Sequence, residues 1–85
     1  MKAFTYTVKD ELGIHARPAG MLAKAAKALD SEITITKGDK TVGAAKIMAL
    51  MGLGVKCGDT ITVTANGGNE EASLAEIRSF LENNL

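Results

Sequence analysis

The sequence predicts an α+β fold, an open-faced β-sandwich in which three helices cover one face of a four-stranded antiparallel sheet. Two observations lead to this prediction: four short segments alternate apolar with polar residues, and three other segments repeat their apolar residues at helical spacing. Their order along the chain is βαββαβα, and one hairpin with mixed connections favours an antiparallel sheet backed by helices. Because no linker or repeat divides the 85 residues, we expect a single domain over residues 1–85.

Strands are predicted where apolar and polar side chains alternate with the period of two that a half-buried sheet requires. Residues 3–8 and 60–65 show this alternation, and residues 31–38 show it up to a glycine-containing turn at residues 37–40. Residues 40–43 then form the predicted return strand of a hairpin. Threonines occupy many of the polar positions, which fits an antiparallel sheet with one face in water.

Helices are predicted at three places in the chain. The first begins at Pro18, whose fixed φ suits a first turn, and it ends before Asp30. A short second helix over residues 44–54 is nearly all apolar and is stopped by two glycines. The third follows Asn69, a good N-cap residue, and has two glutamates in its first turn, where negative charge suits the helix dipole.

The composition argues against several classes of function. Ten basic and ten acidic residues cancel, so no basic surface for nucleic acid is expected. One cysteine and one histidine are too few for a structural zinc site, and we expect neither a metal ion nor another cofactor.

The cysteine usage and the hydropathy pattern indicate a cellular compartment. Cys57 has no partner for a disulfide, so we expect a reducing environment and a semi-buried side chain that fills a turn. No segment reaches the roughly 18 apolar residues of a membrane helix, and the first residues lack the pattern of a signal peptide. We therefore expect a cytoplasmic monomer that does not insert into a membrane.

The segment GIHARPAG, residues 13–20, places the only histidine and the only proline of the chain at the start of the first predicted helix. No Ser, Thr, Asp or Asn stands there to cap the helix, so its first backbone N–H groups are expected to lack an acceptor. Such groups attract an anion, and Arg17 adds a cationic fork that matches phosphate oxygens. The sequence therefore predicts an anion site at the start of this helix, beside Arg17.

His15 is the residue that can do chemistry at this anion site. A neutral imidazole is a nucleophile, and a phosphoryl group on it would lie against the free N–H groups and the guanidinium. This arrangement predicts a phosphohistidine. Plainer interpretations stay open: His15 as a helix cap or an ordinary surface residue, Arg17 as a solvated side chain, and Pro18 as a helix start alone.

The same segment resembles the active-site segment of HPr proteins, the histidine-containing phosphocarriers of the bacterial phosphoenolpyruvate:sugar phosphotransferase system. The resemblance continues through KTVGAAKIMALMGLGVKCGD to the end of the chain. It implies a sheet order of 1-4-2-3 and a phosphoryl carrier that is not itself an enzyme. It also implies that enzyme I phosphorylates His15 on Nδ1, that Arg17 and the backbone of Ala16 hold the group beside Pro18, and that enzyme IIA domains receive it.

A carrier that several proteins recognise needs a docking surface near its histidine. The second predicted helix has more apolar residues than one face can bury, so we expect Leu50 and Leu53 inside and others exposed. The resemblance implies that this helix and one face of the first helix contact enzyme I and enzyme IIA. The residues expected at this surface are Gly20, Lys24, Ile47, Met48 and Met51.

Lys46 departs from the pattern of Gram-positive relatives, in which a regulatory serine at this place is phosphorylated by a dedicated kinase. A lysine cannot carry that modification, so we expect a carrier without the serine switch. Two alternatives to sugar uptake stay open: a carrier in a regulatory phosphorelay, and a regulatory docking module that does not act in transport. A stand-alone hydrolase fits least, because no second histidine or suitably placed acid could orient His15.

Overall fold

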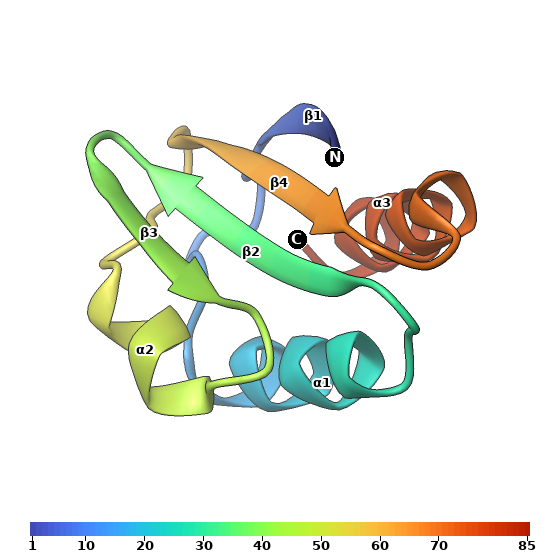
Figure 1. The fold of residues 1–85 in the computed structure, drawn as a ribbon. Coiled ribbons are helices and arrows are strands. Elements are labelled where there is room, and N and C mark those ends of the chain that lie inside the picture. Colours follow the sequence, from blue (N-terminus) through green and yellow to red (C-terminus); the bar gives the residue numbers. More distant parts are fainter.

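The computed structural model describes residues 1–85, which form four strands and three helices in the predicted order. The elements are β1 (Lys2–Thr7), α1 (Ala16–Lys27), β2 (Glu32–Lys37), β3 (Lys40–Gly43), α2 (Ile47–Gly52), β4 (Thr60–Asn66) and α3 (Glu70–Asn84). All strands join one antiparallel sheet in the order β1-β4-β2-β3, and the helices lie on one side of it (Figure 1). The predicted open-faced α+β fold and the sheet order 1-4-2-3 are confirmed.

The two faces of the sheet differ as the alternation predicts. Apolar side chains of β2 and β4 point toward the helices and are buried; they are Ile33, Ile35, Ile61, Val63 and Ala65. The opposite face carries threonines, and the strand register places Thr5, Thr62, Thr36 and Thr41 side by side across all strands. Cross-strand pairs of β-branched residues stabilise such a face, and the hydroxyls of Thr36 and Thr41 are hydrogen-bonded at 2.8 Å.

The helix bounds differ from the prediction at α1 and α2. Helix α1 begins at Ala16, two residues before Pro18, because proline fits any position of a first turn in which the N–H needs no acceptor. Helix α2 begins at Ile47 and not at residue 44. The N–H of Ala44 still donates to the carbonyl of Ile33 at 2.9 Å, so the sheet pairing continues to this residue, and the extended backbone of Lys46 makes that residue the N-cap.

Cys57 is exposed, so the prediction of a semi-buried filler was wrong. Its turn is closed by polar groups alone: the Asp59 carboxylate accepts the N–H of Lys56 at 2.8 Å, and the Asp59 N–H donates back to the Lys56 carbonyl at 3.0 Å. Because these bonds hold the turn, it needs no buried side chain at residue 57.

Helix α3 fixes the segment that leads from β1 to α1. The side chain of Asn69 accepts the N–H of Ala72 at 3.1 Å, which confirms the predicted cap. At the other end, the Leu85 carbonyl accepts the N–H groups of Lys9 and Asp10 at 2.6 and 2.8 Å, and the Leu85 side chain is buried.

No helix of the structure has both the length and the apolar content that crossing a membrane requires.

Candidate functional site

His15 stands at the N-cap position of α1, but its ring does not cap the helix. The backbone of His15 is extended, with φ −100° and ψ −173°, and the side chain makes no capping hydrogen bond. Its N–H donates to the Gly13 carbonyl at 3.1 Å, and its carbonyl accepts the N–H of Ala19 at 2.9 Å. The backbone thus holds the residue in place, and the half-buried imidazole is left free for other contacts.

The first turn of α1 offers two backbone donors without an acceptor. Neither the N–H of Ala16 nor that of Arg17 donates to any backbone or side-chain oxygen, and Pro18 has no N–H. No acidic side chain lies in this turn to offset the positive end of the helix dipole. The prediction that the first N–H groups of this helix have no acceptor is therefore confirmed. These free N–H groups favour an anion next to His15.

Gly13 brings the segment before α1 close to the loop that follows α2. Its φ is +65°, and a Cβ built on it would stand 2.1 Å from the carbonyl oxygen of Val55. That same carbonyl accepts the N–H of Ile14 at 3.1 Å. The segment that precedes α1 is therefore held against the loop that follows α2. At Gly20 the space around a Cβ is open, so this glycine leaves room on the outer surface of α1.

A shallow depression of about 260 Å³ surrounds the imidazole. It is lined by Asp10, His15, Arg17, Pro18, Met21 and Asn84. Arg17 is exposed and forms no ion pair within the chain, so its guanidinium is available to an incoming anion. The structure brings His15, Arg17 and Pro18 together as the sequence predicts.

Three residues of this depression were missed in the sequence. Asn84 comes from the last turn of α3, and no sequence signal connects that turn with the start of α1. Asp10 lies in the polar connector after β1, where its carboxylate accepts the N–H of Leu12 at 2.9 Å. Met21 could have been found, because it follows Arg17 by four positions and so shares its helix face.

The predicted division of α2 into a buried and an exposed face is confirmed. Leu50 and Leu53 are 0% and 5% exposed, whereas Ile47, Met48 and Met51 are 42%, 80% and 39% exposed. Helices α1 and α2 pack against each other, and Lys24 is exposed on α1. We call the exposed residues Ile47, Met48 and Met51 the α2 patch. Contiguous exposed apolar groups of this kind are typical of surfaces that bind other proteins.

The comparisons with known proteins agree over nearly the whole chain. Residues 2–83 match the family described as the PTS HPr component phosphorylation site. The phosphocarrier protein HPr of Mycoplasma genitalium is 44% identical over 85 residues, which are 99% of this chain and 97% of that protein. The HPr of Mycoplasma pneumoniae is 42% identical over 83 residues, 96% of this chain and 94% of that protein.

A solved structure shows the same fold. The crystal structure of HPr-C-His from Thermoanaerobacter tengcongensis has a TM-score of 0.92 at 35% identity, and the match covers 98% of this chain and 93% of that one. The matched family, the sequence identity and the shared fold all agree with the site described above, in which the uncapped start of α1 lies beside the only histidine. The chain belongs to the HPr family, the phosphocarrier proteins of the phosphotransferase system, which carry a phosphoryl group and are not themselves enzymes.

Proposed function

We propose that this chain accepts a phosphoryl group on His15 from phosphorylated enzyme I and passes it to enzyme IIA domains during phosphoenolpyruvate-dependent sugar uptake. In this proposal residues 1–85 act as one HPr-like domain, a monomer in the cytoplasm. The observation that carries the proposal is the pair of unpartnered backbone N–H groups at Ala16 and Arg17, next to an imidazole that the fold does not use.

The transfer step needs no metal ion or other cofactor. The lone pair on Nδ1 of His15 forms the new P–N bond while the bond between phosphorus and the donor group breaks and leaves its electron pair on the donor. Nε2 keeps its proton throughout. The N–H groups of Ala16 and Arg17 donate to the phosphoryl oxygens, the Arg17 guanidinium stabilises their charge, and Pro18 fixes the turn. Delivery to enzyme IIA is the same step in reverse.

Docking places the α2 patch, together with Gly20 and Lys24 of α1, against enzyme I and enzyme IIA. Lys24 and the α2 patch are exposed, Gly20 is half-buried with open space around it, and α1 packs on α2, all of which support this role. Transient complexes of this kind bury a small area, near or below about 1,200 Å². Methionine suits a surface that must fit several partners, because its side chain is unbranched and adaptable.

The proposed carrier has no serine switch. Lys46 is the N-cap residue of α2, is exposed, and has a backbone with φ −110° and ψ 102°. No residue from Gly43 to Gly52 carries a hydroxyl group. A kinase that recognises this helix start would find no acceptor there.

The direct test mixes the protein with enzyme I and phosphoenolpyruvate and measures the intact mass. We expect one added phosphate that is lost in acid, and no added phosphate on His15→Ala at an unchanged melting temperature. Subsequent addition of an enzyme IIA domain should discharge the carrier. An unmodified wild-type protein, or a labelled His15→Ala variant, would remove the assignment. Phosphorylation on His15 without discharge to any IIA domain would instead favour the regulatory phosphorelay.

A further inference from the structure

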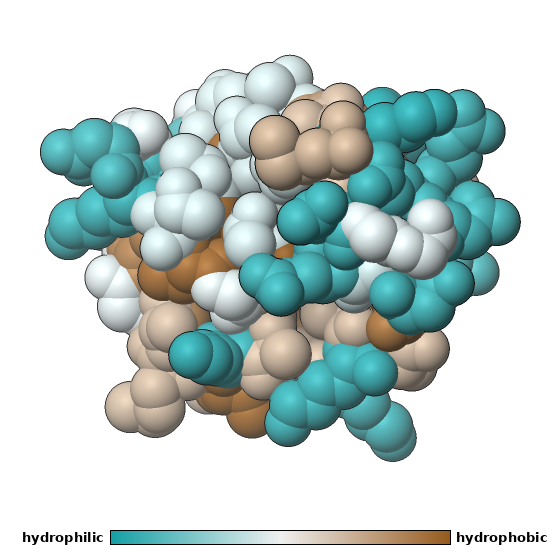
Figure 2. Space-filling view, viewed as in Figure 1, coloured by the Kyte–Doolittle hydropathy of each residue, from teal (hydrophilic) through white to brown (hydrophobic).

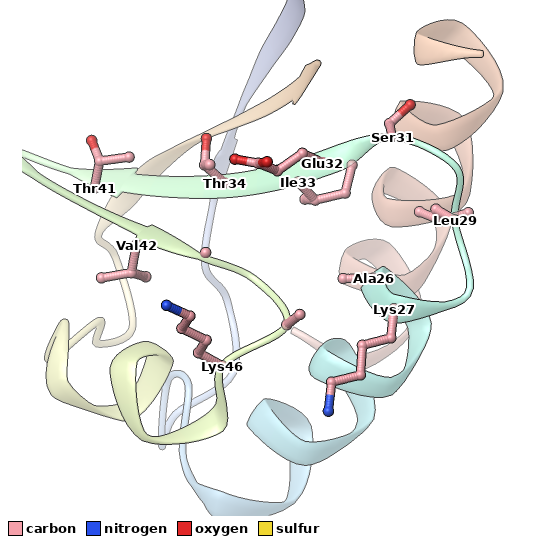
Figure 3. A pocket seen from close by; sticks show the side chains of 12 residues that line it. Ala26, Lys27, Leu29, Ser31, Glu32, Ile33, Thr34, Thr41, Val42 and Lys46 are labelled. Carbon is pink, nitrogen blue, oxygen red and sulfur yellow. The ribbon is translucent and has the colours of Figure 1, made fainter. Parts of the chain in front are cut away.

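The largest hollow of the molecule lies away from His15, between the β3 edge of the sheet and the helices α1 and α2. Its volume is about 560 Å³, and its apolar lining consists of Ala26, Leu29, Ile33, Val42 and Ala45. Helix α2 is too short to cover this corner, so Leu29 and Val42 stay only half-buried. Figure 2 shows hydrophobic surface below β3, and Figure 3 shows the side chains that surround the opening. We call this hollow the β3 cleft.

The backbone of β3 has unpaired groups along the outer side of the strand. In an antiparallel ladder, alternate residues bond to the partner strand, and the bond from Ala44 to Ile33 sets the phase. Val42, opposite Ile35, therefore bonds to β2, while Thr41 and Gly43 direct their backbone groups away from the sheet. The Gly43 carbonyl is occupied by the N–H of Lys46 at 3.2 Å. Both backbone groups of Thr41 and the N–H of Gly43 remain free, since no strand lies beyond β3.

The side of this edge that faces the helices is positively charged. Lys27 and Lys46 line the β3 cleft, and Lys40 begins the strand; none of the three forms an ion pair. The acidic lining residue, Glu32, precedes the buried Ile33 and so belongs to the threonine side of the sheet. An anionic partner on the helix side therefore meets cations that no group of this chain neutralises.

We propose that the β3 edge binds an extended acidic segment of another protein by strand addition. The segment pairs with the free backbone groups of Thr41 and Gly43, as peptides do at other exposed sheet edges. One apolar side chain of the segment enters the β3 cleft beside Val42. Carboxylates on the same side of the segment, two residues before and after it, lie toward Lys40 and Lys46.

Charge also decides against a second copy of this chain as the occupant. Two β3 strands that paired edge to edge would bring Lys40 and Lys46 of both copies to one seam, where like charges repel. An acidic segment is instead attracted by the same lysines. The residues that line the β3 cleft and those that line the depression around His15 are different sets, so we expect the two sites to work independently.

The test is an NMR titration of the ¹⁵N-labelled protein with a short, end-capped peptide of sequence Glu-Thr-Val-Thr-Glu. We expect saturable shifts of the amides of Thr41, Gly43, Ala45 and Lys46, and none at Ala16 or Arg17. The peptide with lysines in place of both glutamates, and the peptide N-methylated at its valine and second threonine, should bind far more weakly. Lys46→Glu should weaken binding by about tenfold, while the matched change Lys56→Glu, remote from the cleft, should not.

Several results would overturn the proposal. One is the absence of saturable shifts at millimolar peptide, and another is a response confined to Ile47, Met48 and Met51. Equal binding of the N-methylated peptide would show that no strand is added. Shifts of Thr41 and Gly43 that depend on protein concentration without peptide would assign the edge to a second copy. Because the titration uses unphosphorylated protein, its outcome does not depend on whether His15 accepts a phosphoryl group.

Discussion

Gly13 lies directly against Val55, so close that a Cβ on Gly13 would stand 2.1 Å from the Val55 carbonyl oxygen. The neighbouring N–H of Ile14 donates to this carbonyl, which joins the start of α1 to the loop after α2. The position of His15 relative to the α2 patch therefore depends on a glycine that is neither in the proposed chemistry nor on the docking surface.

Substitution Gly13→Ala should disturb both the stability of the fold and the transfer reaction. The alanine would have to keep a φ of +65° and displace the Val55 backbone, so we expect a loss of at least about 2 kcal/mol in the free energy of unfolding. Urea unfolding measures this loss. The matched change Gly20→Ala, where a Cβ meets nothing within 4 Å, should leave the free energy of unfolding equal or slightly higher. Equal stability of the two variants would contradict the proposed role of the contact.

Arg17→Ala should slow phosphoryl transfer from enzyme I by at least about tenfold without unfolding the domain. The guanidinium is exposed and unpaired, so its loss removes charge stabilisation and no internal contact. Rapid-quench measurements give the transfer rate, and thermal unfolding monitors the fold. Lys40→Ala removes an exposed cation at the β2–β3 turn, which does not line the depression around His15, and should transfer at the wild-type rate. An unchanged rate for Arg17→Ala would exclude Arg17 from the mechanism.

The two faces of α2 should respond in opposite ways to substitution. Met48→Glu places a charge on the most exposed residue of the α2 patch and should weaken binding to enzyme I by about tenfold, with little change in stability. Leu50→Ala, at a fully buried position, should cost about 2–5 kcal/mol of stability. Isothermal titration with enzyme I and urea unfolding separate the two effects. Thr5→Glu, a new charge on the threonine face, should leave binding unchanged.

The serine switch should be absent from this protein and restorable by one substitution. After incubation with the kinase of the regulated relatives and ATP, the wild-type chain should carry no phosphate from Gly43 to Gly52, which contains no hydroxyl group. Lys46→Ser supplies one at the N-cap of α2 and should gain a single phosphate by mass spectrometry. Phosphate on any residue of this segment of the wild-type chain would contradict the expectation.

Acid should weaken the turn that leads into β4. The N–H of Lys56 and then the ammonium of Lys37 hold the pKa of Asp59 below its ordinary value of 3.8. Because the folded-state pKa is the lower one, this contribution to stability is complete above about pH 4 and is lost as the pH falls through the folded-state pKa. The stability difference between wild type and Asp59→Asn, measured by urea unfolding, should therefore shrink from pH 7 to about pH 3. A difference that grows on acidification would show the opposite linkage.

The sequence was sufficient to predict most elements because their apolar residues repeat with one clear period, while β3 and α2 were predicted from the turn and the glycines beside them. Because apolar and polar residues alternate in β2, the sequence distinguished the buried Ile33 and Ile35 from the threonines beside them. Because α2 has more apolar residues than one face can bury, the sequence also predicted a buried Leu50 and an exposed Met48. The absence of a capping side chain at the start of α1 was predictable as well, since it depends only on which residue types can cap a helix.

Other features depend on contacts between residues far apart in the sequence. Asn84 joins the depression around His15 because α3 ends there, and α2 starts late because Ala44 bonds to Ile33. Cys57 is exposed because polar bonds close its turn. None of these contacts leaves a periodic trace in the sequence.

The uncapped start of α1 has a thermodynamic consequence under the proposed function. An N-cap interaction contributes about 0.5–2 kcal/mol to a helix, and here a phosphoryl group on His15 would supply it. Phosphorylation and folding are then linked, so the loaded carrier unfolds less readily than the empty one. By the same linkage, the folded chain holds its phosphohistidine in a state of lower transfer potential than a free phosphoimidazole. The affinity of the helix start for phosphate would thus set the driving force that remains for delivery to the next protein.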